Sequence, residues 1–305
     1  MNPKSKISNI IFAMPWSRII SGIIAIVLAV SCTLLGGWYF TIAIGIIVFF
    51  GQLEYFNLVR SRGMRPAAKT TISVSLVLLG ICNFQPSLAD AIMPIAGTFI
   101  CFYLLFQPQL ATIADISASI MGLFYVGYLP SYWVRLRNIQ DGYVNLGNYL
   151  YDYLFNTQLA QIKLDDLPRG FTFTILTFLC IWAADIGAYI FGKYFGRTPL
   201  SSISPKKTVE GAIFGMVGSL VLALWGSYFL NLPYFFLTGL TLGLLIGIAS
   251  LLGDLTESLL KRDAGVKDSG QLIPGHGGIL DRTDSYIFTA PLVYYFITLI
   301  LPLID

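Results

Sequence analysis

The sequence predicts an all-α polytopic membrane protein with about nine transmembrane helices. Hydrophobic residues make up 56% of the 305 positions and charged residues only 11%. The apolar residues gather in runs of about the 20 residues that a helix needs to cross a bilayer. Lipid cannot satisfy open backbone groups, and the runs lack the two-residue alternation of barrel strands. Helices are therefore the spanning elements that we expect.

Nine apolar runs follow one another along the chain. They lie near residues 18–35, 38–56, 70–85, 90–107, 114–134, 171–192, 211–230, 234–253 and 286–304. The third and fourth runs are the least regular, because Pro86, Asp90 and Pro94 interrupt them. Together the runs leave no room for a soluble domain of ordinary size. We divide the chain into an N-terminal membrane region with about five spans and an outside loop, residues 1–170, and a C-terminal membrane region, residues 171–305, in which we expect the chemistry.

The basic residues predict the orientation of the chain. With the N-terminus inside, nine crossings place 15 of the 19 lysines and arginines on the cytoplasmic side. The other four share one outside loop: Arg135, Arg137, Lys163 and Arg169. This imbalance fits the positive-inside rule. We therefore expect the N-terminus and two charged loops, 193–210 and 254–285, on the cytoplasmic side of a bacterial plasma (inner) membrane.

The segment 258–284 carries the densest polar chemistry of the chain. Its 27 positions hold four basic residues, four aspartates and the single histidine. If the eighth helix continues past its apolar run, Asp254, Ser258 and Lys261 share one face, with Glu257 beside them. An acid at the end of an apolar helix is costly unless it is paired, coordinated or hydrated. Asp254 is therefore a candidate functional residue.

A glycine-rich loop follows this helix. Lys267 and Asp268 come first, and the sequence P-G-H-G-G ends at Gly278. Backbone N–H groups of such a loop can approach phosphate oxygens closely. Asp281 and Asp284 then stand at the start of the last helix, where acids also suit the helix dipole as caps. Carboxylates among lysines and arginines suit Mg²⁺ with a polyphosphate, and His276 is expected to contact phosphate or brace the loop.

A second polar cluster surrounds the sixth and seventh runs. Asp185 lies inside the sixth run, so we expect it to face the bundle interior or a water-filled cavity, or else to bond a neighbouring helix. Residues 187–193 nearly match a P-loop, but Tyr194 replaces the required Ser or Thr and the segment is helical. The sequence S-P-K-K-T-V-E-G follows, with Lys206 and Lys207 at a helix start where they can hold a phosphate.

These motifs together resemble a known family. The sequence S-L-L-K-R-D-A-G-V-K-D-S-G-Q-L-I-P-G-H-G-G-I-L-D-R-T-D resembles the signature of phosphatidate cytidylyltransferases, also called CDP-diacylglycerol synthases, without departure. The upstream patterns W-x-x-D-x-x-A-Y-x-x-G and S-P-K-K-T-x-E-G match the same family. The resemblance covers about residues 180–285, whereas the first 170 residues are compatible only as apolar spans.

The resemblance implies that the chain converts CTP and phosphatidate to CDP-diacylglycerol and diphosphate. It implies Mg²⁺ as cofactor, with the identity of a second cation left open, and Asp254 and Asp281 as metal ligands. The catalytic residues that it suggests are Asp254, Asp281, Lys267, Asp268 and Asp284. The substrate-binding residues are Ser204, Lys206, Lys207, Lys261, Arg262, His276, Gly277, Gly278, Arg282 and Asp185. Besides the two substrates, it implies contact with membrane lipids, no nucleic acid, and a homodimer.

In this interpretation the sixth to ninth helices wall a polar cavity, open to the cytoplasm and to the inner leaflet. Two other functions compete with it. A CTP-dependent polyprenol or phytol kinase would transfer the γ-phosphate and need a base to activate an alcohol. A transporter of an anionic metabolite would use Asp185 along its pathway, but transport does not explain the paired lysines and aspartates on one face.

Overall fold

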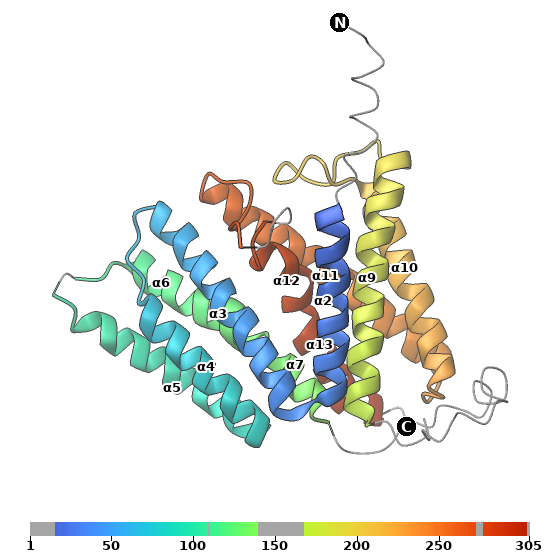
Figure 1. The fold of residues 1–305 in the computed structure, drawn as a ribbon, viewed down its shortest axis with the longest axis horizontal. Helices are drawn as coiled ribbons and strands as arrows, with labels where there is room; N and C mark the ends of the chain where they lie inside the picture. The colour runs from blue at the N-terminus through green and yellow to red at the C-terminus, as the bar shows by residue number, and fades with distance from the viewer. Residues whose placement is uncertain (1–15, 109, 140–167, 273–276, 304–305) are drawn as a thin grey trace, which may run out of the picture.

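The computed structural model describes residues 16–108, 110–139, 168–272 and 277–303, and this part of the chain is helical with no β-strand (Figure 1). The elements are α2 (Trp16–Leu35), α3 (Gly37–Ser61), α4 (Ala68–Phe84), α5 (Pro86–Leu105), α6 (Ile113–Met121), η1 (Gly122–Tyr128), α7 (Ser131–Arg137), α9 (Arg169–Phe195), α10 (Val209–Phe229), α11 (Phe235–Asp263), α12 (Leu280–Ile287), α13 (Thr289–Tyr295), η3 (Phe296–Ile300) and η4 (Leu301–Leu303).

Seven helical stretches of the described residues are long and apolar enough to cross a membrane. They are α3, α5, the stretch from α6 to α7, α9, α10, α11 and the stretch from α12 to η4. Two shorter apolar helices are Gly22–Leu35 and Ala68–Phe84. The all-α polytopic membrane class is thereby confirmed, and each predicted run overlaps one of these stretches. The number of crossings and the polar cavity stay predictions.

The irregular third and fourth runs are also helical. Pro86 stands at the first position of α5, where its missing N–H is not needed. Pro94 lies inside the same helix, which nevertheless continues to Leu105. The stretch from residue 187 to Lys193 lies inside α9, which agrees with rejecting a P-loop there.

The helix α10 packs against both α9 and α11 by means of glycines. A Cβ atom on Gly215 would lie 2.6 Å from the carbonyl oxygen of Ala184 in α9. One on Gly243 of α11 would lie 2.7 Å from Cα of Leu220 in α10. Small residues let helix backbones approach closely in a membrane, where packing rather than water drives association. The three helices form a close-packed support for the polar residues at their ends.

One hydrophobic core joins the two halves of the chain. It combines Phe40 and Leu78 of the N-terminal helices with Phe173, Ile181 and Val293 of the C-terminal helices. The boundary near residue 170 therefore does not separate two cores. The assignment of the chemistry to residues 171–305 stays a prediction.

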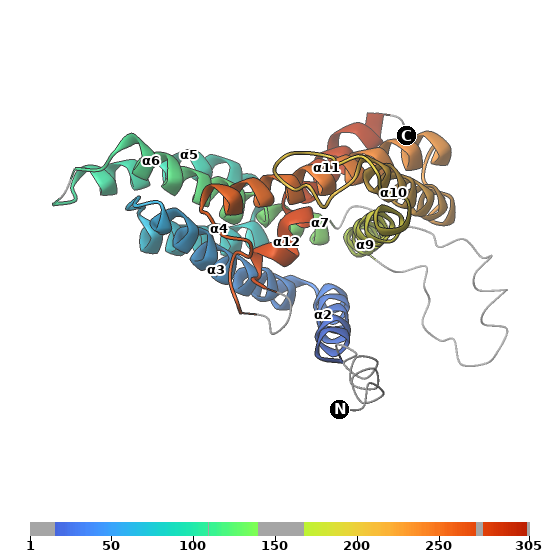
Figure 2. The same cartoon turned by 90° about the horizontal axis from the view of Figure 1, so that it is seen from above.

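The connections 196–208, 264–272 and 277–279 lie at the same end of the bundle, near the start of α2 (Figure 1). This agrees with their predicted placement on one side of the membrane, although residues 273–276 lie outside the described part. Seen from above, α12 lies between α3 and α9 (Figure 2). The last apolar stretch, which α12 begins, therefore starts in the middle of the molecule.

The predicted outside loop is wrong for two of its arginines. Arg135 and Arg137 lie in α7 and are buried. Arg135 is drawn into the bundle because Asp90 of α5 binds its Nη1 at 2.7 Å. Arg137 donates to the carbonyl oxygens of Thr33, at 2.5 Å, and Leu34, which the end of α2 leaves without helical partners. Arg169 begins α9, and Lys163 lies outside the described residues.

Candidate functional site

The polar face of α11 forms one wall of the site. The helix runs without a break from Phe235 to Asp263, so the condition under which these polar residues share a face is met. Residues three and four apart on a helix lie on the same face. Asp254, Glu257, Ser258 and Lys261 therefore line one side of its last turns.

The helix α12 reaches this face because Gly253 leaves room for it. A Cβ atom on Gly253 would collide with the carbonyl oxygen of Asp284. Without a side chain at this position, the backbone of α12 lies directly against α11. Asp284, although 30 positions further along the chain than Asp254, is thereby placed beside it.

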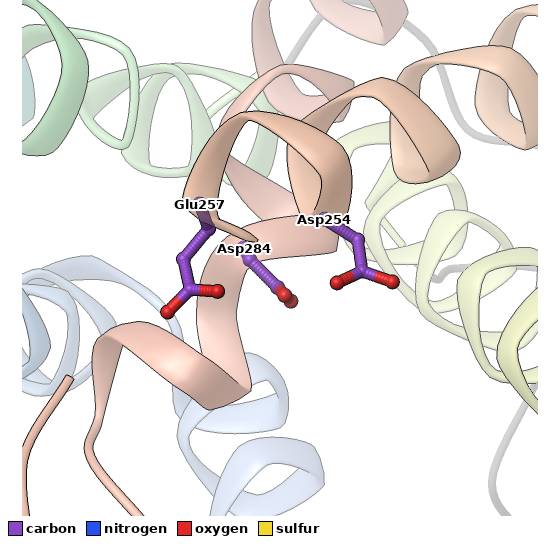
Figure 3. A group of neighbouring side chains, drawn as sticks. All are labelled: Asp254, Glu257 and Asp284. Atoms are coloured by element: carbon purple, nitrogen blue, oxygen red, sulfur yellow. The ribbon is translucent and has the colours of Figure 1, made fainter. Parts of the chain in front are cut away.

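Three carboxylates meet where the two helices touch (Figure 3). One oxygen each from Asp254, Glu257 and Asp284 lie within 4.8 Å of one another. Figure 3 shows Asp284 between the other two, with all three side chains directed to the same side. Glu257 is fully buried, and its Oε1 atom has no hydrogen-bond partner. Three acids this close, one of them with an unpaired buried oxygen, are costly unless a cation or a proton joins them.

Two lysines partly offset this negative charge. Lys207, from the connection before α10, places Nζ 2.5 Å from Oδ2 of Asp254. Lys261 lies between two acids, at 2.5 Å from Oε2 of Glu257 and 2.6 Å from Oδ1 of Asp281. Three carboxylates thus share two ammonium groups, and Asp284 adds a fourth acid beside them. Both lysines are mobile cations on long stems, able to pair with phosphate as well as carboxylate.

Asp281 is held more firmly than the other acids. Its Oδ2 atom accepts hydrogen bonds from the N–H of Ser269 at 2.9 Å, the hydroxyl of Ser269 at 3.0 Å and the N–H of Gly278 at 2.8 Å. The structure therefore groups Asp254 with Glu257 and Asp284, and places Asp281 next to them across Lys261. The predicted pairing of Asp254 with Asp281 as metal ligands stays a prediction.

Asp185 of α9 faces the same junction. Its Oδ1 atom accepts from the hydroxyls of Ser250 in α11, at 3.4 Å, and Ser285 in α12, at 3.3 Å. The alternative in which this acid bonds neighbouring helices is thus observed. Since Ser285 follows Asp284 directly, Asp185 also lies close to the acidic cluster.

The connection before α10 folds back to bring its lysines to the site. The Thr208 side chain caps α10 by accepting from the N–H of Gly211 at 3.2 Å. Glu210 accepts from the N–H groups of Arg197 and Thr198, at 3.1 and 3.2 Å, and so pins the start of the connection to the helix. The carbonyl oxygen of Ser204 accepts from the N–H of Lys207 at 3.0 Å. This turn directs Lys207 toward Asp254, whereas Lys206 is exposed.

The other predicted site residues surround this centre. Arg262 donates to the carbonyl oxygens of Ile203 at 3.4 Å and Val266 at 3.0 Å, and so ties α11 to the connection before α10. Lys267, Asp268 and Arg282 are exposed. Gly277 has a φ of 81° and no room for a side chain beside Asp281, and the N–H of Gly278 already binds that acid. His276 lies outside the described residues.

Comparisons with known proteins agree with the motifs that occupy this site. The model of a family described as the Cytidylyltransferase family matches residues 16–300. The chain belongs to the cytidylyltransferase family. A phosphatidate cytidylyltransferase of Synechocystis sp. is 61% identical over 96% of this chain and 99% of its own length. Phosphatidate cytidylyltransferase 4, chloroplastic, of Arabidopsis thaliana is 44% identical over 92% of this chain and 72% of its own length. A phosphatidate cytidylyltransferase of Bacillus subtilis is 32% identical over 92% of this chain and 97% of its own length.

Two acids of this cytidylyltransferase were not among the predicted site residues. Glu257 stands three positions after Asp254 and was noted in the sequence only as a neighbour of the polar face. Its helical spacing would have sufficed to predict it as a site residue. Glu54 of α3 is buried, and its carboxylate binds the segment before α12. An acid inside the second apolar run is a signal by itself, but nothing in the sequence indicates which distant segment it contacts.

Proposed function

We propose that this protein is a phosphatidate cytidylyltransferase, which joins the cytidylyl group of CTP to phosphatidate and releases diphosphate. The observation that carries the proposal is the convergence of Asp254, Glu257, Asp284, Lys207 and Lys261 at the end of membrane-spanning helices. A reaction between a polyphosphate and a membrane lipid needs charged groups at this depth. The names of the similar proteins support this activity, and support neither the polyprenol kinase nor the transporter.

The reaction needs positioning more than acid–base chemistry. A phosphatidate oxygen attacks the α-phosphorus of CTP, and the bond to the diphosphate leaving group breaks in line with it. A phosphate monoester is already ionised at neutral pH, so no residue has to remove a proton from it. The protein holds the two reactants in line and offsets their negative charge.

Lys207 and Lys261 are the cations best placed to bind the phosphates. Each now pairs with a carboxylate of the cluster, and each exchanges that partner for a phosphate oxygen as CTP binds. Lys206, Arg262, Lys267 and Arg282 add positive charge around them. Ser204, Asp185, Gly277 and Gly278 line the same site in this proposal, and Asp268 anchors the neighbouring cations. His276, which lies outside the described residues, is included only because the resemblance implies it.

The acidic cluster fits a divalent cation. Its oxygens lie within 4.8 Å of one another, and the buried Oε1 atom of Glu257 has no partner. Carboxylates together with substrate phosphates are the usual ligands of Mg²⁺. Asp254, Glu257 and Asp284 are thus the ligands that we propose, with Asp281 as the further ligand that the resemblance implies; a second cation is also accommodated in this proposal. When bound, Mg²⁺ neutralises charge on the phosphates of CTP.

The location follows from the substrates. CTP is cytosolic and phosphatidate lies in the bilayer, so the connections 196–208, 264–272 and 277–279 face the cytoplasm in this proposal. The N-terminus lies on the same side, in a bacterial plasma membrane where lipids surround the helices. A homodimer is also part of this proposal, and the resemblance alone supports it.

Doubly labelled CTP tests the proposed activity. The purified protein in detergent receives Mg²⁺, phosphatidate and CTP labelled separately at the α- and γ-phosphates. We expect the α-label in the lipid product and the γ-label in diphosphate. Transfer of γ-label to an added prenol would instead establish the kinase. No turnover of CTP with any lipid would exclude both enzymes, and uptake assays in vesicles would then test transport.

A further inference from the structure

Glu54 joins the N-terminal half of the protein to the catalytic end. It lies in the last third of α3 and is 8% exposed. Its Oε2 atom accepts from the N–H of Leu280 at 2.9 Å and lies 2.9 Å from the hydroxyl of Ser269, whose one proton is shared with Oδ2 of Asp281. Its Oε1 atom accepts from the N–H of Ile279 at 2.9 Å. All three donors belong to residues 269–280, which lead into α12.

These bonds satisfy both the acid and the start of α12. The first N–H groups of a helix have no partner within the helix and attract negative charge. Glu54 takes this capping role from a different helix, more than 200 positions earlier in the chain. A buried carboxylate is tolerated where several donors satisfy it. Among the described residues, none of the ion pairs involves Glu54, so hydrogen bonds hold its charge.

Two glycines make room for this carboxylate. A Cβ atom on Gly270 would lie 2.5 Å from Oε1 of Glu54, and one on Gly278 would collide with Oε2. The segment is therefore shaped around the acid. Two glycines of the motif serve this fit, in addition to any contact with phosphate.

A continuous path leads from Glu54 to the acidic cluster. The hydroxyl of Ser269 lies 2.9 Å from Oε2 of Glu54 and 3.0 Å from Oδ2 of Asp281. Asp281 binds Lys261, and Lys261 binds Glu257. The N–H of Leu280, which Glu54 also holds, begins the helix that carries Asp284. Displacement of this segment from α3 would shift Asp281 and Asp284 together.

We propose that Glu54 is a positioning residue, which fixes residues 269–272 and 277–280 against α3 so that Asp281 and Asp284 face Asp254 and Glu257. The proposal rests on the proposed cytidylyltransferase function. Glu54 touches neither substrate in this role. Through Glu54, the N-terminal helices help to position the catalytic site and do not serve only as a membrane anchor.

Glu54→Gln tests the role with little change in volume. A neutral amide keeps one acceptor oxygen but places an NH₂ group against N–H donors. We expect kcat to fall at least about tenfold, as is typical for loss of charge-assisted hydrogen bonds. The KM for CTP should change less, because Lys206 and Lys207 lie on the other connection. Glu54→Asp, which keeps the charge on a shorter stem, should recover part of the lost kcat.

Asp115→Asn is the matched control. Asp115 is likewise a buried acid that accepts backbone N–H groups, from Arg65 at 2.5 Å and Thr112 at 2.8 Å, but in the N-terminal half away from the site. It should lower thermal stability as much as Glu54→Gln does and leave kcat near the wild-type value. Equal losses of kcat in both variants would reduce Glu54 to a structural residue and overturn the proposal.

Hydrogen exchange separates this proposal from the proposed function. In Glu54→Gln, amide exchange of the peptide 277–285 should rise at least about tenfold, while the peptides of α9 and α10 exchange as in the wild type. This measurement needs no substrate. If the wild type does not transfer cytidylyl groups but the exchange in Glu54→Gln still rises, the proposed function is refuted and the positioning role of Glu54 is supported. A wild-type kcat together with unchanged exchange in Glu54→Gln would overturn the positioning role of Glu54.

Discussion

The two ends of the helix bundle bury charge in different ways. Where α11 meets α12, three carboxylates share Lys207 and Lys261, Asp284 adds a fourth acid, and the buried Oε1 atom of Glu257 has no partner. At the other end, where α7 approaches the start of α9, Arg135 has its own acid, Asp90, at 2.7 Å. The first region carries an excess of one sign of charge, and the second region pairs its charge.

The surroundings of the charges differ in the same way. The guanidinium of Arg135 lies 4.2 Å from the ring centre of Tyr132, and the hydroxyl of Tyr128 donates to the same Asp90 at 2.6 Å. Aromatic rings and hydroxyls thus complete a contact between α5 and α7. The acidic cluster instead contacts Lys207, from the connection before α10, and Lys261, from α11 itself. Asp90 balances the charge of Arg135 one to one, although Nε and Nη2 of Arg135 are buried without a hydrogen-bond partner, as is Oε1 of Glu257. What distinguishes the acidic cluster is its excess of negative charge, which leaves it capacity for a further cation.

Replacing Asp254 should produce the largest effect on turnover. Asp254→Asn removes one charge from the cluster and the anionic partner of Lys207 at once. We expect kcat to fall by about 10²–10³-fold, the usual loss when one group that offsets developing charge is removed. Thermal stability should stay level or rise, because Asp284 loses an anionic neighbour. Turnover and melting temperature of the purified variant measure the two effects.

Asp263→Asn on the same helix is the control. Asp263 is exposed and pairs with Arg62 at 3.4 Å, and exposed ion pairs of this kind contribute about 0–1 kcal/mol. Turnover should remain near the wild-type value. More than a tenth of wild-type kcat in Asp254→Asn would contradict the role of the acidic cluster.

Replacing Glu257 should produce a smaller loss and a specific change in cation dependence. Glu257→Gln keeps the volume of the buried side chain but removes its charge. If Glu257 is a cation ligand, the Mg²⁺ concentration at half-maximal rate should rise by about 10–100-fold, and excess Mg²⁺ should restore part of the rate. Titration of activity with Mg²⁺ measures the shift. An unchanged midpoint would leave Glu257 as a partner of Lys261 only.

Much of the site could be predicted from the sequence where it depends on local geometry. The positions of Asp254, Ser258 and Lys261 follow from one uninterrupted helix, and a period of 3.6 residues places them on one face. The turn that carries Lys206 and Lys207 is also local, since Thr208 caps the helix that follows. Hydrophobic runs predicted the spanning helices for the same reason.

Contacts between distant helices could not be predicted in this way. Asp284 joins Asp254 because Gly253 lets two backbones touch, and Glu54 binds Ile279 across more than 200 positions. No local pattern encodes either pairing. The error at Arg135 and Arg137 has a related origin, because a count of basic residues in loops cannot see that Asp90 and the end of α2 draw them into the bundle.

Replacing Arg135 should have the smallest effect on turnover and a clear effect on stability. Arg135→Met keeps much of the buried volume but leaves Asp90 without its ion pair. Asp90 is half exposed, so water compensates part of the loss, and we expect about 1–3 kcal/mol of destabilisation. A double-mutant cycle with Asp90→Asn isolates the pair from the packing of the side chain. Because Arg135 lies far from the acidic cluster, kcat of the folded fraction should stay near the wild-type value. A large loss of kcat in Arg135→Met without a loss of stability would show instead that the charge of Arg135 is coupled to the acidic cluster. The contrast between the two ends of the bundle would then no longer hold.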